Sequence, residues 1–91
     1  MYQITEYSYQ QAKRLGVTIK PSTNKKKKID VFKDGDKIAS IGAIGFGDYP
    51  TFMKTEGKEY AEKRRQAYKK RHEKDRHIKG TAGYFADQIL W

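Results

Sequence analysis

Four consecutive lysines, 25–28, form the densest charge in this sequence, and no acidic residue lies between Pro21 and Ile29. In an extended chain, successive side chains point to opposite faces, so two of the ammonium groups would project on each side. Ammonium groups placed in this way can straddle and neutralise a phosphate backbone. Alternatively, the lysines form a solvated sheet edge that prevents pairing with another sheet. The run therefore predicts a polyanion contact or a protected edge.

A second basic segment covers residues 58–79, which hold ten Lys/Arg and four acidic residues. The three glutamates share one side of the expected helix, which resembles an ordinary ion-paired surface. Lys63, Lys70 and Lys74 form a flanking row with fewer acids, and we consider this row the better candidate for a polyanion contact. A solvated helix face is the alternative.

The same segment contains a stripe of residues at helical spacing, in which arginines stand where aliphatic residues would be expected. At 100° per residue, the stripe holds Tyr60, Ala61, Arg64, Ala67, Tyr68, Arg71, Asp75 and Ile78. One interpretation is a half-buried network that orients the helix on the sheet, with Arg71 and Asp75 paired. The other is a phosphate or base pocket, in which an arginine binds the phosphate through paired hydrogen bonds and a tyrosine stacks on the base.

Residue patterns typical of enzymes are weak in this chain. His72 and His77 would lie about 140° apart on a straight helix, which is poor geometry for a shared metal. The segment 40–42 followed by Arg64 loosely echoes the small GIY-YIG nucleases, but residues 29–31 read Ile-Asp-Val and lack the required tyrosine. No Ser-His-Asp, Walker or HExxH pattern is present. We expect no catalytic residue, no metal and no cofactor, and keep a GIY-YIG-like nuclease as a remote alternative.

The elements that must position these residues begin with a small sheet. Alternating apolar and polar residues predict strands over 17–20, 29–33 and 37–41. The dipeptide Asp34-Gly35 between the last two strands is the strongest short signal for a hairpin. The sequence therefore predicts an antiparallel sheet of about three strands with a central hairpin.

Helices are expected before and after these strands in the sequence. Thr5 or Ser8 can begin a helix that ends at Gly16, and Asp48 with Pro50 resembles the start of another, which Gly57 weakens. A long basic helix is expected from Lys58 to about His77 and a short closing one over 81–91. We expect Trp91 to pack against the sheet and against Tyr68 or Phe32. Residues 1–91 are thus predicted to form a single basic α+β domain.

Composition sets the limits on function. The formal charge is +9, and the chain has seven Tyr, four Phe and one Trp but no Cys. A small aromatic-rich core is expected, and a reducing compartment fits the absence of cysteine. No apolar run is long enough for a membrane span, and the first residues lack the apolar stretch of a signal peptide. We therefore expect a protein of the cell interior or the virion that is not secreted and has no membrane partner.

Several blocks of the chain, over residues 17–91, occur in a fixed order and spacing. They are lysines before a strand, Ile-Gly or Phe-Gly after the hairpin, Asp48-Tyr49, Tyr68 with Arg71-His72, Ala82-Gly83 and Leu90-Trp91. In these blocks the chain resembles a small family of basic proteins, uncharacterised in activity, from large DNA viruses and some bacteriophages. The resemblance implies a viral origin and a compact fold, but no activity.

Charge and resemblance together predict a non-enzymatic viral nucleic-acid-binding protein that contacts backbone phosphates and is packaged in the virion. DNA is favoured over RNA as the partner. The alternative is a small structural virion protein, of minor capsid or cement type, that binds an acidic viral protein or forms oligomers. Exposed Tyr2, Tyr7 and Tyr9 would then be its anchors. The candidate nucleic-acid-binding residues are Lys25, Lys26, Lys27, Lys28, Lys63, Arg64, Lys70, Arg71 and Lys74.

Overall fold

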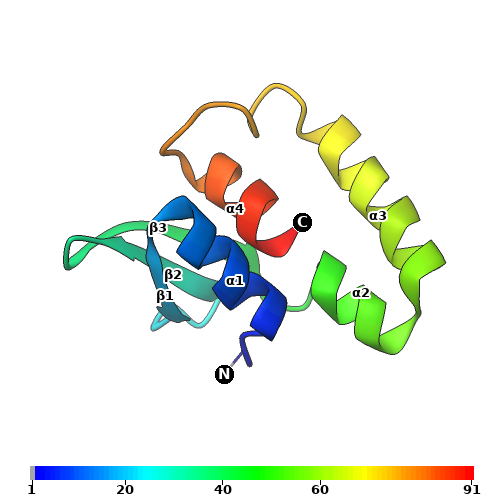
Figure 1. Ribbon diagram of the computed structural model, residues 1–91, viewed down its shortest axis with the longest axis horizontal. Coiled ribbons are helices and arrows are strands. Elements are labelled where there is room, and N and C mark those ends of the chain that lie inside the picture. The colour runs from blue at the N-terminus through cyan, green and yellow to red at the C-terminus, as the bar shows by residue number, and fades with distance from the viewer. Residues whose placement is uncertain (1) are drawn as a thin grey trace.

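A three-stranded antiparallel sheet and four helices make up the computed structural model, which describes residues 2–91. The predicted α+β class is confirmed. Figure 1 shows the order of the elements along the chain. They are α1 (Glu6–Leu15), β1 (Thr18–Pro21), β2 (Lys27–Lys33), β3 (Asp36–Ala43), α2 (Tyr49–Thr55), α3 (Lys58–Arg71) and α4 (Ala82–Leu90).

The hairpin between β2 and β3 forms at the predicted dipeptide. Lys33 pairs with Asp36, so that Asp34 and Gly35 alone make the turn. Both have positive φ, at 53° and 85°, as a two-residue hairpin turn of the type favoured by Asp-Gly requires. The strand order β1-β2-β3 places β2 in the centre of the sheet.

One face of the sheet and two helices enclose the core. The strand register brings Ile19 opposite Val31 and Ile29 opposite Ile41, so these four side chains share a face, and all of them are buried. Helices α1 and α4 cover this face in Figure 1. They contribute buried side chains that include Ala12, Phe85, Ile89 and Leu90.

The helices begin at the polar residues that local chemistry favours. Thr5, Asp48 and Thr81 each accept a hydrogen bond at the side-chain oxygen from the backbone N–H three residues later, at 3.3, 2.9 and 3.2 Å. Such caps satisfy backbone donors that the first turn leaves without partners. Gly16 ends α1 with a φ of 74°. The expected starts at Thr5, Asp48 and Thr81 are confirmed.

The long basic helix is shorter than predicted. α3 ends at Arg71 instead of near His77, and residues 72–80 form turns. Arg76 in these turns reaches Glu73 at 2.8 Å and the buried Asp87 of α4 at 3.7 Å. The contact with Asp87 joins residues eleven positions apart, which helical spacing does not indicate, so the sequence pattern could not show where the helix ends. Gly57, with a φ of 94°, separates α2 from α3 completely.

Trp91 closes the contact between α3 and α4. Its ring stacks on Tyr68 with centroids 4.5 Å apart and an interplanar angle of 10°. A second ring, Phe52 of α2, lies 6.1 Å away. The predicted contact with Tyr68 is therefore confirmed, whereas Phe52 takes the place proposed for Phe32, because α2 and α3 bring their own rings to this side of α4.

Candidate nucleic-acid interface

The four consecutive lysines do not form one extended run. Lys25 and Lys26 lie exposed in the turn between β1 and β2, Lys27 is half-buried at the start of β2, and Lys28 is buried. Because β2 is the central strand, the lysines do not protect an edge there. The alternation of two side chains on each face is thus wrong for the first half of the run, where a turn replaces the expected strand.

Lys28 belongs to an interior ion pair. Its side chain is only 5% exposed, and its Nζ lies 2.9 Å from Oδ2 of Asp48, which is 1% exposed. Nζ also donates to the carbonyl oxygen of Phe46. The prediction that Lys28 contacts phosphate is therefore wrong, because its charge is already compensated inside the protein.

Asp48 is held in its charged form by the groups around it. Burial acts to raise the pKa of this carboxyl, but hydrogen bonds from Thr51, Lys28 and Tyr2 outweigh burial and lower the pKa below its ordinary value. The Tyr2 hydroxyl donates to Asp48 at 2.7 Å, and burial together with this carboxylate raises the pKa of the tyrosine. Through Asp48, Tyr2 and Lys28 thus join the N-terminal segment and β2 to the start of α2.

A second buried carboxylate shapes the turn that carries the exposed lysines. Asp30 accepts hydrogen bonds from the hydroxyls of Ser22 at 2.6 Å and Ser40 at 2.7 Å, and from the backbone N–H of Thr23 at 3.3 Å. Burial opposes ionisation, yet these bonds lower the pKa of Asp30. The contacts anchor one end of the turn, so Lys25 and Lys26 project from a defined backbone.

The buried side of α3 differs from the predicted stripe. Ala61 and Tyr68 point inward as expected, but Arg64 and Arg71 are exposed. Each lies against an aromatic ring instead, with Arg64 5.2 Å from the Phe52 centroid and Arg71 6.0 Å from that of Tyr68. In the described part of the chain, no ion pair joins Arg71 to Asp75, so the expected pairing is wrong.

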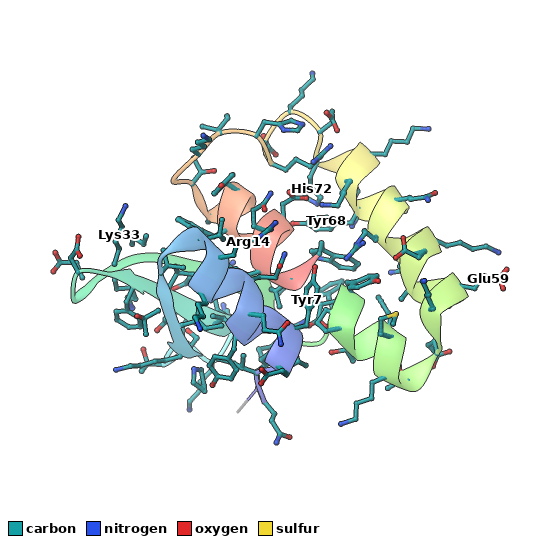
Figure 2. The ribbon with its side chains drawn as sticks, viewed as in Figure 1. Tyr7, Arg14, Lys33, Glu59, Tyr68 and His72 are labelled. Atoms are coloured by element: carbon teal, nitrogen blue, oxygen red, sulfur yellow. The ribbon has the colours of Figure 1, made fainter. Side chains whose placement is uncertain are left out.

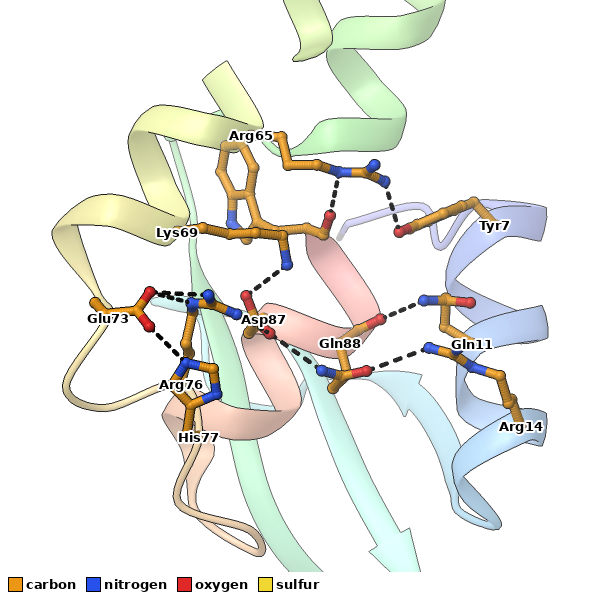
Figure 3. Close-up of polar contacts among 11 residues, drawn as sticks. Tyr7, Gln11, Arg14, Arg65, Lys69, Glu73, Arg76, His77, Asp87 and Gln88 are labelled. Atoms are coloured by element: carbon orange, nitrogen blue, oxygen red, sulfur yellow. Dashed lines mark hydrogen bonds and ion pairs between the residues drawn. The ribbon is translucent and has the colours of Figure 1, made fainter. Parts of the chain in front are cut away.

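Arg65 and Lys69 occupy the inner positions that the stripe assigned to Arg64 and Arg71. The Arg65 guanidinium lies 3.5 Å from the Tyr49 ring centroid, and it donates to the Trp91 carbonyl at 2.7 Å and to the Tyr7 hydroxyl at 3.1 Å. Lys69 pairs with Asp87 at 2.8 Å. Figure 3 shows the hydrogen bonds of Arg65 and Lys69, which link α3 to α1 and to the segment of α4 and Trp91.

Sequence reasoning missed these two residues, although the signal was present. Positions 61, 65, 68, 69 and 72 also follow helical spacing and include the same Ala61 and Tyr68. The deciding partner, Asp87, is distant in sequence and could not be assigned from spacing.

The flanking row predicted from Lys63, Lys70 and Lys74 forms only in part. Lys63 lies on α3 and pairs with Glu59 at 4.0 Å, with both side chains exposed. Lys70 is exposed near the end of the helix, whereas Lys74 lies in the turns beyond it. Because α3 ends at Arg71, the expected alignment with Lys74 is wrong.

A groove of about 440 Å³ separates the start of β2 and the end of β3 from α3. Arg64 and Arg71 line it from α3, His72 lines it from just beyond the end of α3, and Lys27 lines it from β2. Tyr68 and Trp91 also line the groove, and Figure 2 shows Tyr68 and His72 between α3 and α4. Among residues 2–91, no acidic side chain lines this groove.

A second hollow of about 660 Å³ adjoins the first. Lys25 lines the second hollow only, whereas Lys27, Lys28 and Phe46 line both. The structure thus brings together Lys25, Lys27, Arg64 and Arg71 of the predicted set around two neighbouring hollows. Lys63, Lys70 and Lys74 do not line either hollow.

The expected aromatic anchors at the N-terminus are largely occupied within the molecule. Tyr2 binds Asp48, and the ring of Tyr7 lies 5.5 Å from that of Tyr49. Both are half-buried, and only Tyr9 of the three is exposed. The expectation that Tyr2 and Tyr7 are free for a partner is therefore wrong.

No family model, curated protein or solved structure matches this chain. The geometry must therefore carry the functional argument. Over residues 2–91, no three His, Cys, Asp or Glu side chains group as ligands for a metal ion. No helix in the same range has the length and apolar character needed to cross a membrane.

Proposed function

We propose that this protein is a non-enzymatic nucleic-acid-binding module that holds backbone phosphates along the groove between β2 and α3. The observation that carries the proposal is the set of Lys27, Arg64 and Arg71 around a groove that no acidic side chain of residues 2–91 lines. Phosphates bound there displace counterions without meeting a repelling carboxylate. The guanidinium groups add paired hydrogen-bond donors that match phosphate oxygens.

The chemistry of the groove favours binding without sequence preference. Base edges are read by sets of Arg, Asn and Gln side chains, and no Asn or Gln of residues 2–91 lines this groove. Its arginines and Lys27 can still bind phosphate oxygens, which carry no sequence information. Asn24, which lines the second hollow, already accepts a hydrogen bond at Oδ1 from the Lys26 backbone N–H at 2.9 Å. The resemblance to basic proteins of large DNA viruses supports DNA as the polymer and the virion as the place of action.

Salt-dependent binding tests the proposal. Fluorescence anisotropy with a labelled mixed-sequence DNA should show affinity falling steeply between about 50 and 200 mM salt. The double variant Arg64→Ala/Arg71→Ala should weaken binding equally for unrelated sequences. It should also reduce the slope of log K against log salt by about two, one for each lost phosphate contact.

The matched control removes two charges elsewhere. Lys13 on α1 and Lys33 next to the hairpin turn are exposed, and neither lines the groove. Lys13→Ala/Lys33→Ala should therefore change affinity much less than the arginine pair does. Equal losses in the two double variants would refute the groove. Absence of binding to DNA at 50 mM salt would refute the function and favour the structural virion protein.

A further inference from the structure

Phe46 is the most exposed large apolar side chain in residues 2–91, at 75% of its surface. It lies in the loop between β3 and α2, beside the partly exposed Ile44. The chain has four phenylalanines for a small core, and burying an aromatic side chain removes roughly 150–250 Å² from water. A ring left in solvent here is therefore available to a ligand.

The backbone on both sides of this ring is anchored. The Ile44 N–H donates to the Lys26 carbonyl at 3.0 Å, and the Phe46 carbonyl accepts from the buried Lys28. A Cβ at Gly47 would lie 2.1 Å from Cζ of Phe52, so that only glycine permits this close approach to the ring. Because the loop is already ordered, presenting the Phe46 ring to a ligand requires little further loss of backbone entropy.

Phe46 stands at the boundary of the two hollows, and cations lie beyond it on either side. It lines the hollow that contains Lys25 and also the groove that contains Arg64 and Arg71. Lys27 lines both. A chain of phosphates that passes from one hollow to the other would therefore cross the exposed ring.

We propose that Phe46 is a stacking platform for an unpaired base and that the preferred ligand is single-stranded nucleic acid. The inference rests on the proposed function, since the flanking phosphates would be held by Lys25 on one side and by Arg64 and Arg71 on the other, with Lys27 at both hollows. Base stacking on an aromatic side chain tolerates any sequence, because every base has a π face. In a duplex the faces of the bases are covered by their neighbours, so a duplex offers this ring only its phosphates.

The test compares three DNA ligands of the same length: a single strand, its duplex, and a single strand whose central nucleotides are abasic. We expect the wild type to bind the intact single strand on the order of 10-fold more tightly than the abasic strand. Phe46→Ala should lose that difference and bind both strands as the wild type binds the abasic one. Phe46→Trp should retain the preference, because the larger ring still stacks.

Tyr9→Ala is the matched control, since Tyr9 is an exposed aromatic residue on α1 that lines neither hollow. It should leave all three affinities unchanged. Equal wild-type affinity for the intact and abasic strands would overturn the stacking proposal and leave the phosphate groove standing. If the wild type bound none of the three ligands, the proposed function itself would be overturned.

A binding assay with lipid vesicles tests whether the Phe46 ring binds a membrane surface instead of a base. Vesicles of phosphatidylcholine and phosphatidylserine provide anionic headgroups with an apolar interior. If Phe46→Ala abolished binding to such vesicles but left single-strand affinity unchanged, the ring would serve a lipid surface and the stacking proposal would be wrong. Thermal unfolding of every variant should match that of the wild type, since the exposed ring contributes little to the core.

Discussion

At the scale of single residues, the pair of Lys28 and Asp48 determines how the candidate interface is built. Both side chains are buried, and their contact at 2.9 Å joins the central strand to the first turn of α2. Lys28 also holds the Phe46 carbonyl, so the same ammonium group supports the loop between the two hollows. A lysine that sequence alone groups with its neighbours thus shapes the interface instead of binding at it.

Replacing the buried Lys28 should lower the free energy of unfolding much more than replacing an exposed lysine of the same run. Lys28→Met keeps most of the volume but leaves the Asp48 carboxylate without its cation, and the loss of one partner of a buried pair costs about 3–5 kcal/mol. Lys26→Met, two residues earlier on the exposed turn, should change the free energy of unfolding by no more than about 0.5 kcal/mol. Urea denaturation followed by circular dichroism measures both. Equal effects would contradict the interior role of Lys28.

At the scale of elements, the contact between α3 and α4 forms one wall and part of the lining of the groove. Tyr68 stacks on Trp91, while Arg65 donates to the Trp91 carbonyl and Lys69 pairs with Asp87. Ring stacking and charged hydrogen bonds therefore both hold α3 against α4 and Trp91. Arg64 and Arg71 face the groove because the inner side of α3 is committed to these contacts.

Trp91→Ala should separate these helices and lower the free energy of unfolding. Truncation of a buried tryptophan costs about 3–5 kcal/mol, and this side chain is buried among Tyr68, Phe52 and α4. Ile78→Ala, at an exposed position in the turns after α3, should have little effect. Chemical denaturation of both variants gives the comparison. An unchanged midpoint for Trp91→Ala would show that the closing segment is not part of the core.

At the scale of the whole molecule, three carboxylates lie inside the fold and a groove lined by cations lies at its surface. Asp30, Asp48 and Asp87 are buried and paired with cations, while the groove is lined by basic and aromatic side chains and, among residues 2–91, by no acidic one. The buried carboxylates therefore act on the stability of the fold and do not offset the positive charge of the groove.

The stability of the fold should fall in acid. The pKa values of Asp30 and Asp48 are lowered in the folded protein, so their ionisation stabilises the fold above the ordinary aspartate pKa of about 3.9. That stabilisation is lost as the pH falls through the folded pKa values. Denaturation between pH 7 and pH 3 should show a decline that begins at about pH 5.

Asp48→Asn isolates the charge, because asparagine still caps a helix. This variant should be less stable than the wild type at pH 7, and its stability should depend less on pH below 5. Asp34→Asn, in the exposed hairpin turn, is the matched substitution and should leave the wild-type curve as it is. A wild-type stability that does not change down to pH 3 would contradict the role of the buried carboxylates.

Local chemistry alone predicted much of the fold. Asp34-Gly35 specifies its turn through backbone conformations that need no distant partner, and Thr5, Asp48 and Thr81 cap their helices through hydrogen bonds three residues away. The α+β class followed from these signals and from the alternation of Ile19, Ile29, Val31 and Ile41. For the interface, the sequence identified Lys25, Lys27, Arg64 and Arg71 as candidates but did not indicate which of the basic residues would meet.

The tertiary structure decided which charges turn inward. Lys28 is buried because Asp48, twenty residues later, offers it a carboxylate, and Lys69 turns inward toward Asp87 for the same reason. The direction in which α3 faces, and its end at Arg71, depend on Asp87 and Trp91 of a later segment. Helical spacing lists the residues that share a face but does not choose the face, because that choice depends on partners that only the folded chain brings within hydrogen-bond distance.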